Sequence, residues 1–319
     1  MKQLTLQQAF NLTFHNKFSF NDFLNLDISK HITQQNFKEI LFFKTSEELK
    51  KYHNFLIYLL IKCMKINKEV VFSYREGVSI YDALYPHKNN QYFFKTDIKS
   101  FFGSISEENI KKCFLSNLNE FSIDKTEIKQ YINQILNLIV YNNQLPVGFS
   151  TSSQLSNAIL YIFDNELEEY CIKNDITYTR YSDDLIFSSK NKNNLLNLTT
   201  IIQDLLNLHF NNKLFLNKSK TKYFENWEKV EILGLIITKN GYITIDKKLK
   251  KNIEVILHFY LTDKKKFDDI LNKRFNSKLS KISGLLNHIN NIDKGFIIKL
   301  RKRYGNFVVD KFIHMDKNG

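Results

Sequence analysis

The feature that most constrains this chain is a pair of adjacent aspartates at the tip of a predicted β-hairpin. Residues 176–189 form two runs rich in β-branched and aromatic side chains, and these runs meet at residues 182–184, Ser-Asp-Asp. Another such run, Tyr92–Ile98, carries Asp97 near its end. Turn chemistry alone can explain an Asp-Asp pair, because aspartate suits turns. Aspartates on separate strands of one sheet can also converge on two divalent cations, so both explanations stay open at this point.

Helical periodicity accounts for most of the remaining chain. The first ninety residues look mainly helical, for example over 46–66. Further helices are expected over 106–114 (with Ser106 as N-cap), 126–141, 152–172 and 193–208. A second hairpin is expected at Asn240-Gly241, a dipeptide typical of a type I′ turn. Helices that alternate with antiparallel hairpins predict an α+β fold.

The chain is strongly basic, and the basic residues are concentrated near its end. The formal net charge is +13 over 319 residues, and the segment 247–303 holds 16 Lys and Arg against 5 Asp and Glu. This bias favours a surface that follows a phosphate backbone, although a solvated helical face is the alternative. No apolar run is long enough to span a bilayer, and the three cysteines lack metal-ligand spacing. We therefore expect a cytoplasmic protein without a membrane partner.

Ordered motifs surround the aspartates. They read Phe94-x-x-Asp97-x-x-x-Phe101-Phe102-x-Ser104-Ile105, then Leu145-Pro-x-Gly148-x-x-Thr151-Ser152-x-x-Leu155-Ser156-Asn157, then Tyr181-Ser-Asp-Asp184. Asn217-Lys-Ser-Lys220-Thr221 and Leu233-Gly234-Leu235 follow. Together they resemble motifs A, B and C of reverse transcriptases and the two motifs after them. Upstream Ser79-Ile80 and Pro86-His87, and downstream Lys281–Ile289 and Lys299–Gly305, resemble bacterial enzymes of the retron and defence-associated, abortive-infection-like type.

This resemblance implies a right-hand polymerase with fingers, an antiparallel-sheet palm and a helical basic thumb. Residues 1–90 would form the N-terminal helical region and fingers. Residues 91–245 would form the palm, with fingers helices at about 107–142, and residues 246–319 the thumb. The implied activity is RNA-directed DNA synthesis, in which deoxynucleotides are added to a 3′-hydroxyl. The implied partners are an RNA template in the form of a structured non-coding RNA, the DNA product, and a second protein in antiphage defence.

The resemblance also assigns roles to residues. Asp97, Asp183, Asp184 and the backbone carbonyl of Ile98 would hold two Mg²⁺ ions, for which Mn²⁺ can substitute. The residues expected to contact the nucleotide are Phe102, as a gate against the ribose 2′-hydroxyl, Gly148, Ser152, Lys220 and Arg75. Those expected to contact nucleic acid are Tyr181, Asn157, Lys281, Lys299, Arg301 and Arg303. Four of these residues have a structural alternative: Phe102 as a core aromatic, Ser152 and Asn157 as capping or buried hydrogen-bonding groups, and Lys220 as a solvated lysine.

Two departures from the family pattern keep other functions open. Val147 stands where the family usually has Gln, and no Lys-x-Arg fingers strand is evident in the N-terminal region. Template-independent or self-primed polymerisation at the same metal site is therefore an alternative. A catalytically idle scaffold that binds RNA is another, although all three aspartates are present. A two-carboxylate nuclease would not require the motif around Gly148.

Overall fold

The computed structural model describes residues 4–37, 40–225 and 229–314, so the end of the predicted thumb, 315–319, lies outside the described residues. Contacts divide the chain into two compact units. The first comprises the residues up to Ser79 together with Phe93–Tyr223, and the second comprises Ile80–Tyr92 and the residues from Phe224 onward. Strands at 229–245, assigned above to the palm, thus belong with the C-terminal helices. The division into fingers, palm and thumb at residues 90 and 245 stays a prediction.

The first unit begins with short helices and a β-hairpin. Its elements are α1 (Leu6–Phe14), α2 (Phe20–Leu24), η1 (Ile28–His31), β1 (Ile32–Phe37), β2 (Ile40–Thr45), α3 (Glu47–Leu59) and η2 (Ile61–Cys63). β1 and β2 pair antiparallel from Ile32↔Thr45 to Phe37↔Ile40. The expectation of mainly helical structure missed this hairpin, because the β1 sequence Ile-Thr-Gln-Gln-Asn-Phe lacks apolar alternation. Ser46 caps α3 by accepting a hydrogen bond from the Leu49 amide.

A four-stranded sheet forms the centre of the first unit. Its strands are β3 (Tyr92–Asp97), β4 (Thr177–Tyr181), β5 (Asp184–Ser189) and β6 (Lys222–Glu225), in the order β4-β5-β3-β6. β4 and β5 are antiparallel, and Tyr181 pairs with Asp184. The predicted hairpin is therefore confirmed, with Ser182 and Asp183 as its two-residue turn. Because β5 and β3 are neighbours, the sheet brings the turn and Asp97 to adjacent strands.

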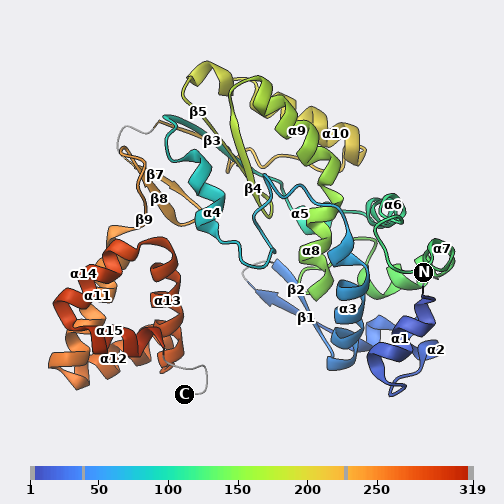
Figure 1. Ribbon diagram of the computed structural model, residues 1–319, viewed down its shortest axis with the longest axis horizontal. Coiled ribbons are helices and arrows are strands. Elements are labelled where there is room, and N and C mark those ends of the chain that lie inside the picture. The colour runs from blue at the N-terminus through green and yellow to red at the C-terminus, as the bar shows by residue number, and fades with distance from the viewer. Residues whose placement is uncertain (1–3, 38–39, 226–228, 315–319) are drawn as a thin grey trace. The chain divides into compact units, whose positions relative to one another are not determined.

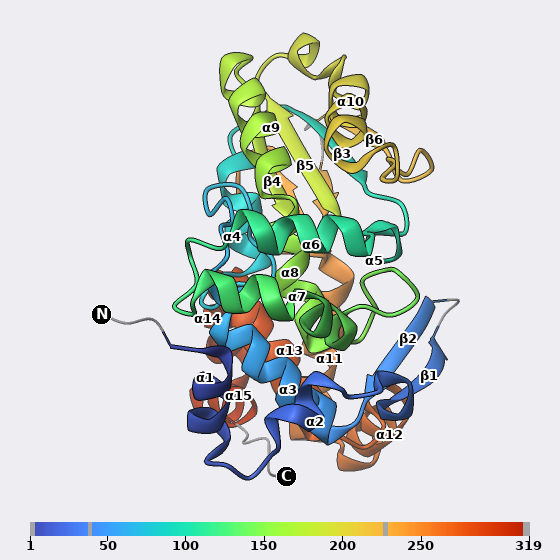
Figure 2. The same ribbon diagram turned by 90° about the vertical axis from the view of Figure 1, so that its right-hand side faces the viewer.

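Helices pack around this sheet. They are α5 (Phe101–Ser104), α6 (Glu107–Ser116), α7 (Lys125–Ile139), α8 (Ser150–Ile159), α9 (Tyr161–Lys173), η4 (Lys192–Leu195) and α10 (Leu198–Phe210). α9 and α10 lie beside the sheet (Figures 1 and 2), whereas α3, α6, α7 and α8 pack against one another (Figure 2). Ser106 caps α6 as predicted. The single helix predicted over 152–172 is wrong: the backbone leaves helical geometry at Leu160, where ψ is 4°.

The second unit combines a small sheet with a helical bundle. Its elements are α4 (Ile80–Leu84), η3 (Tyr85–His87), β7 (Lys229–Ile232), β8 (Leu235–Thr238), β9 (Ile243–Ile245), α11 (Lys247–Thr262), α12 (Lys264–Phe275), α13 (Leu279–Ile292), α14 (Lys294–Tyr304) and α15 (Asn306–Ile313). The orange and red helices in Figure 1 are α11 to α15. No helix among the described residues is long and apolar enough to span a membrane.

The β8–β9 hairpin forms where the sequence predicted, but its turn is not type I′. Only Gly241 of the Asn240-Gly241 pair has a positive φ, 71°, whereas a type I′ turn needs two such residues. The Gly241 amide donates to the Thr238 carbonyl, and the Thr238 hydroxyl accepts from the Tyr242 amide. The contact between the Thr238 hydroxyl and the Tyr242 amide thus favours a loop longer than the two residues of a type I′ turn, with Gly241 at its positive-φ position.

Candidate active site

Asp97 and Asp183 lie on the same cavity in the first unit. The Ile98 amide donates to the Asp183 carbonyl at 3.1 Å, and the Asn217 amide donates to the Asp97 carbonyl at 2.8 Å. These backbone bonds join the end of β3 to the β4–β5 turn and to the loop before β6. The cavity has a volume of about 590 Å³, and Ile98 lines it together with both aspartates. Asp97 itself is 2% exposed.

Lys220 is the cationic side chain of this cavity. Its Nζ lies 2.6 Å from Oδ2 of Asp97, and this hydrogen bond raises the pKa of Lys220. The other carboxylate oxygen, Oδ1 of Asp97, is buried and has no hydrogen-bond partner among the described residues. Burial raises the pKa of Asp183, and the charges of Asp184 and Asp97 raise it further. Bound cations would relieve this crowding of negative charge, so the residues present fit a metal site.

The carboxylate of Asp184 has a different partner from those of Asp97 and Asp183. Its Oδ1 lies 2.8 Å from Nζ of Lys95 on β3, and Asp184 does not line the cavity of Asp97 and Asp183. Within the described ranges, no group of three His, Cys, Asp or Glu side chains is gathered closely enough to hold a metal ion. The structure thus brings two of the three predicted carboxylate ligands to one cavity and pairs the third, Asp184, with a lysine. Sequence reasoning missed Lys95, although its spacing of two from Asp97 places both on one face of the strand.

Apolar side chains form about half of the cavity lining. Phe101 and Phe102 both line the cavity, with their rings 5.3 Å apart. Phe101 is 3% exposed, whereas Phe102 is half-buried. Phe102 is therefore the more accessible of the two aromatic rings in this cavity. Leu41, Phe43 and Val147 also line this cavity. The β2 residues were missed because the sequence did not predict the β1–β2 hairpin.

Gly148 is required by its neighbours in β2. Its φ is +105°, and a Cβ at this position would collide with the Phe43 carbonyl and lie 2.8 Å from the Phe42 ring. The Phe43 amide also donates to the Val147 carbonyl at 2.8 Å. Glycine is therefore needed here for backbone packing, and Gly148 does not line the cavity. Its expected nucleotide contact stays a prediction.

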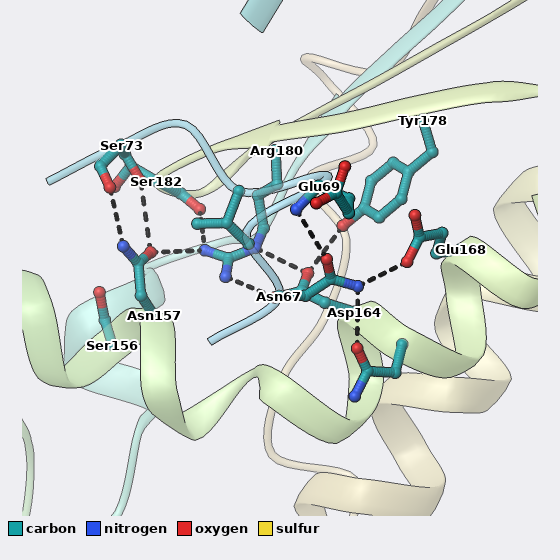
Figure 3. Close-up of polar contacts among 12 residues, drawn as sticks. Asn67, Glu69, Ser73, Ser156, Asn157, Asp164, Glu168, Tyr178, Arg180 and Ser182 are labelled. Carbon is teal, nitrogen blue, oxygen red and sulfur yellow. Dashed lines mark hydrogen bonds and ion pairs between the residues drawn. The ribbon is translucent and has the colours of Figure 1, made fainter. Parts of the chain in front are cut away.

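Ser152 and Asn157 have protein partners. The Ser152 hydroxyl donates to the Pro146 carbonyl at 2.6 Å, which joins α8 to the preceding loop. Asn157 is buried, and its amide group donates to the Ser73 carbonyl and accepts from Arg180 (Figure 3). Both side chains make buried hydrogen bonds within the protein, and their expected contacts with nucleotide and nucleic acid stay predictions.

The remaining predicted residues lie elsewhere. Arg75 donates to the carbonyls of Lys68 and Val71 and lines a separate cavity of about 380 Å³ in the first unit. Tyr181 is half-buried, and burial raises its pKa, as does the nearby Tyr74.

The predicted basic contacts all belong to the second unit. Lys281 on α13 and Lys299 on α14 are exposed. Arg301 pairs with Asp310 at 2.8 Å, and Arg303 lies 3.6 Å from Glu254. Two of the four predicted basic contacts are therefore engaged in surface ion pairs, which are weak and exchangeable.

Comparisons with known proteins agree with the motifs. Residues 44–237 match the family model for reverse transcriptase (RNA-dependent DNA polymerase). The retron Ec83 reverse transcriptase of Escherichia coli is 26% identical over 251 residues, which cover 77% of each chain. The retron Ec73 reverse transcriptase of the same organism is 27% identical and covers 69% of this chain and 68% of its own.

Solved telomerase structures are also similar. One from Candida tropicalis has a TM-score of 0.47 and 15% identity, and the match covers 97% of this chain and 51% of the telomerase. One from Candida albicans has a TM-score of 0.43 and 13% identity, with 86% and 53% covered. The chain thus spans about half the length of these telomerases.

The family model covers more than half of the chain, and the relatives named above are retron enzymes. Reverse transcriptases generally use divalent metal ions, copy an RNA template and produce DNA. This chain belongs to the reverse transcriptase family and is a retron-type RNA-directed DNA polymerase.

Proposed function

We propose that nucleotide addition takes place in the cavity lined by Asp97 and Asp183, with two Mg²⁺ ions that Mn²⁺ can replace. The buried, unpartnered Oδ1 of Asp97 supports this proposal, as does the raised pKa of the crowded Asp183. Magnesium prefers oxygen ligands and needs few protein carboxylates when a triphosphate supplies others. Bound there, Mg²⁺ would lower the pKa of the primer 3′-hydroxyl and neutralise charge on the departing pyrophosphate.

The protein side chains have distinct roles in this proposal. Asp97, Asp183 and the Ile98 carbonyl hold the ions, and Asp184 joins them by exchanging its contact with Lys95. Lys220 is 64% exposed, so its ammonium group is free to turn from Asp97 to the triphosphate. The half-buried ring of Phe102 stands against the sugar, and Tyr181 supports the primer end.

Primer extension with a matched pair of variants tests the metal assignment. With Mg²⁺, an RNA template, a DNA primer and deoxynucleotides, Asp183→Ala should lower the extension rate at least about a thousandfold and retain the wild-type circular dichroism spectrum. Asp204→Ala removes an exposed aspartate on α10 and should leave the rate unchanged. Extension by Asp183→Ala at the wild-type rate would refute the assignment.

Template-independent synthesis is a second candidate, and the apolar wall of the cavity favours it. The side chains of Leu41, Phe43 and Val147 offer no hydrogen bond to a nucleotide, which leaves Ser100, Gln144 and Asn217 as the neutral polar groups of the lining. Lys220 is the one Lys or Arg among the lining residues within the described chain. Supplying single deoxynucleotides without a template decides between the two. Homopolymer products would favour template-independent synthesis, whereas their absence alongside RNA-directed extension favours templated copying.

We also propose that the template is a structured non-coding RNA and that synthesis serves antiphage defence, with a second protein as partner. The retron enzymes among the relatives and the exposed lysines of α13 and α14 support an RNA partner. The free cysteines, Cys63, Cys113 and Cys171, suit a reducing cytoplasm. Sequencing the nucleic acid that copurifies with the chain identifies the template. Equal plaque counts for wild type and Asp97→Ala across a broad phage panel would contradict the defence role.

A further inference from the structure

A buried arginine ties the catalytic hairpin to two helices (Figure 3). Arg180 on β4 is 0% exposed. Its Nε and Nη2 donate to the two oxygens of Asp164 on α9, at 2.8 and 2.6 Å. Its Nη1 donates to the Ser182 carbonyl at 3.0 Å and to the Asn157 side chain on α8 at 3.1 Å. One guanidinium group thus contacts α8, α9 and the turn that precedes β5.

Stability alone does not explain a charged pair at this depth. Both side chains of the Arg180–Asp164 pair are 0% exposed, so each loses its hydration on folding. Apolar residues of similar volume commonly match or exceed the stability of a buried ion pair. The planar guanidinium does offer several donors in fixed directions. The carboxylate of Asp164 fixes one edge of that plane, so the orientation of the remaining Nη1 donor is also fixed.

The turn held by that donor has an unfavourable backbone. Ser182 has a φ of 60°, in the left-handed region that disfavours residues with a Cβ. Its carbonyl accepts from Arg180, and its hydroxyl lies 2.8 Å from the Tyr74 hydroxyl. The next carbonyl, that of Asp183, accepts from the Ile98 amide at 3.1 Å. Side-chain and backbone donors therefore hold the two residues that direct the Asp183 carboxylate.

We propose that Arg180 is a positioning residue for DNA synthesis. Clamped by Asp164, it holds the Ser182 carbonyl and thereby keeps the Asp183 carboxylate directed at the cavity that it shares with Asp97. Through Asn157, the same group fixes α8 relative to the turn. The inference rests on the proposed role of Asp183 in metal binding.

The first test is Arg180→Lys, which keeps the charge but has one ammonium group in place of a planar fork. The variant should be assayed well below its own melting temperature. The kcat for primer extension should fall about tenfold or more, whereas the KM for deoxynucleotide should change less than about threefold. The Mg²⁺ concentration for half-maximal rate should rise by about threefold or more, because a misdirected Asp183 binds metal less well. Wild-type kcat and Mg²⁺ dependence would overturn the proposal.

The matched control is Tyr178→Phe. The Tyr178 hydroxyl donates to the same Asp164 oxygen as Arg180, at 2.9 Å, but Tyr178 makes no hydrogen bond to the turn among the described contacts. This variant perturbs the buried cluster without releasing Ser182. It should lower the melting temperature and leave both kcat and the Mg²⁺ dependence at wild-type values. An equal change in Mg²⁺ dependence in both variants would mean that Arg180 acts only through stability.

If Arg180→Lys does not fold, a double variant distinguishes the role of Arg180 in positioning the turn from its role in stabilising the fold. Arg180→Met with Asp164→Leu replaces the ion pair by apolar side chains and should fold about as stably as wild type. It should nevertheless extend primers slowly, because nothing then holds the Ser182 carbonyl. A stable double variant with wild-type extension would overturn the positioning role. Asp183→Ala, assayed in parallel, separates the two hypotheses: wild-type activity there refutes the metal assignment instead.

Discussion

Nζ of Lys220 lies 2.6 Å from Oδ2 of Asp97, although the two residues are 123 positions apart in the chain. The lysine side chain is 64% exposed and the aspartate side chain 3% exposed. Water therefore reaches one partner and not the other, and a cation that enters the cavity competes with the lysine for the buried carboxylate. We therefore expect a divalent cation to displace the Lys220 ammonium group from the Asp97 carboxylate.

Replacing Lys220 should make the stability of the chain depend more on Mg²⁺. In Lys220→Met, Asp97 loses its cationic partner, and the melting temperature in a chelator should fall. Added Mg²⁺ should restore it, so the Mg²⁺-induced rise in melting temperature should exceed that of wild type. Lys218→Met, an exposed lysine in the same loop, is the control and should behave as wild type. Equal Mg²⁺-induced shifts in all three proteins would contradict the exchange.

Shortening Phe102 should weaken discrimination against ribonucleotides. Phe102→Ala removes the ring that faces the cavity, so the ratio of kcat/KM for ribonucleotide to that for deoxynucleotide should rise about tenfold to a hundredfold. Phe114→Leu alters a fully buried phenylalanine on α6 that does not line this cavity. It should lower the melting temperature and leave the ratio unchanged. Steady-state kinetics with paired nucleotides measure both, and an unchanged ratio in Phe102→Ala would argue for a core aromatic.

Two glycine substitutions should have opposite effects on stability. Gly148→Ala places a Cβ against the Phe43 carbonyl at a φ of +105°, and should cost about 1–3 kcal/mol from backbone strain alone. Gly284→Ala on α13 meets no atom within 4 Å and should stabilise the chain by up to about 1 kcal/mol. Urea denaturation provides both values. A neutral Gly148→Ala would mean that β2 moves away from this loop at little cost.

The buried His53 should make the chain sensitive to mild acid. Its Nε2 donates to the Leu138 carbonyl at 2.8 Å, and burial lowers its pKa to about 4. The unfolded chain takes up a proton near pH 6.5 and the folded chain does not. Stability is therefore complete above pH 6.5 and falls by up to about 3 kcal/mol as the pH drops towards 4. His53→Gln should flatten this part of the pH profile. An equally steep decline in the variant would assign the acid sensitivity to other groups.

Asp293 should stabilise the second unit in a pH-dependent way. Burial by itself raises the pKa of Asp293, but hydrogen bonds from Lys250, Thr244 and the Phe296 amide outweigh it and lower the pKa. The stabilisation is then present above about pH 4 and lost as the pH falls through the lowered pKa. Asp293→Asn should cost about 1–3 kcal/mol at neutral pH, with the difference shrinking below about pH 4. A pH-independent difference would mean that the carboxylate charge contributes nothing.

The sequence predicted best those elements that depend on local contacts alone, such as helix caps and short turns. Ser106 caps α6, and the Ser182-Asp183 turn joins β4 to β5, because caps and two-residue turns depend on nearby backbone atoms alone. The neighbouring strand that carries Asp97 was also predicted, since a buried central strand is apolar on both faces. These elements were sufficient to bring Asp97 and Asp183 to the same cavity.

Contacts between distant segments were not predictable in the same way. The break at Leu160 involves no proline or glycine, the residues that would have indicated it in the sequence. The first strand of the β1–β2 hairpin is polar and exposed. It is a strand because it pairs with β2, and its sequence shows no alternation of apolar residues. The Lys95–Asp184 and Arg180–Asp164 pairs each join residues from different elements. No spacing rule along the chain indicates which lysine or arginine an aspartate will meet.

The bond from the Phe43 amide to the Val147 carbonyl fixes the edge of β2 against the loop before α8. Leu41 and Phe43 on that strand line the nucleotide-sized cavity. Substitutions in β2 should therefore alter substrate kinetics even though no reacting group lies in that strand. A mutational survey of this enzyme would then rank a non-catalytic hairpin among its most sensitive segments.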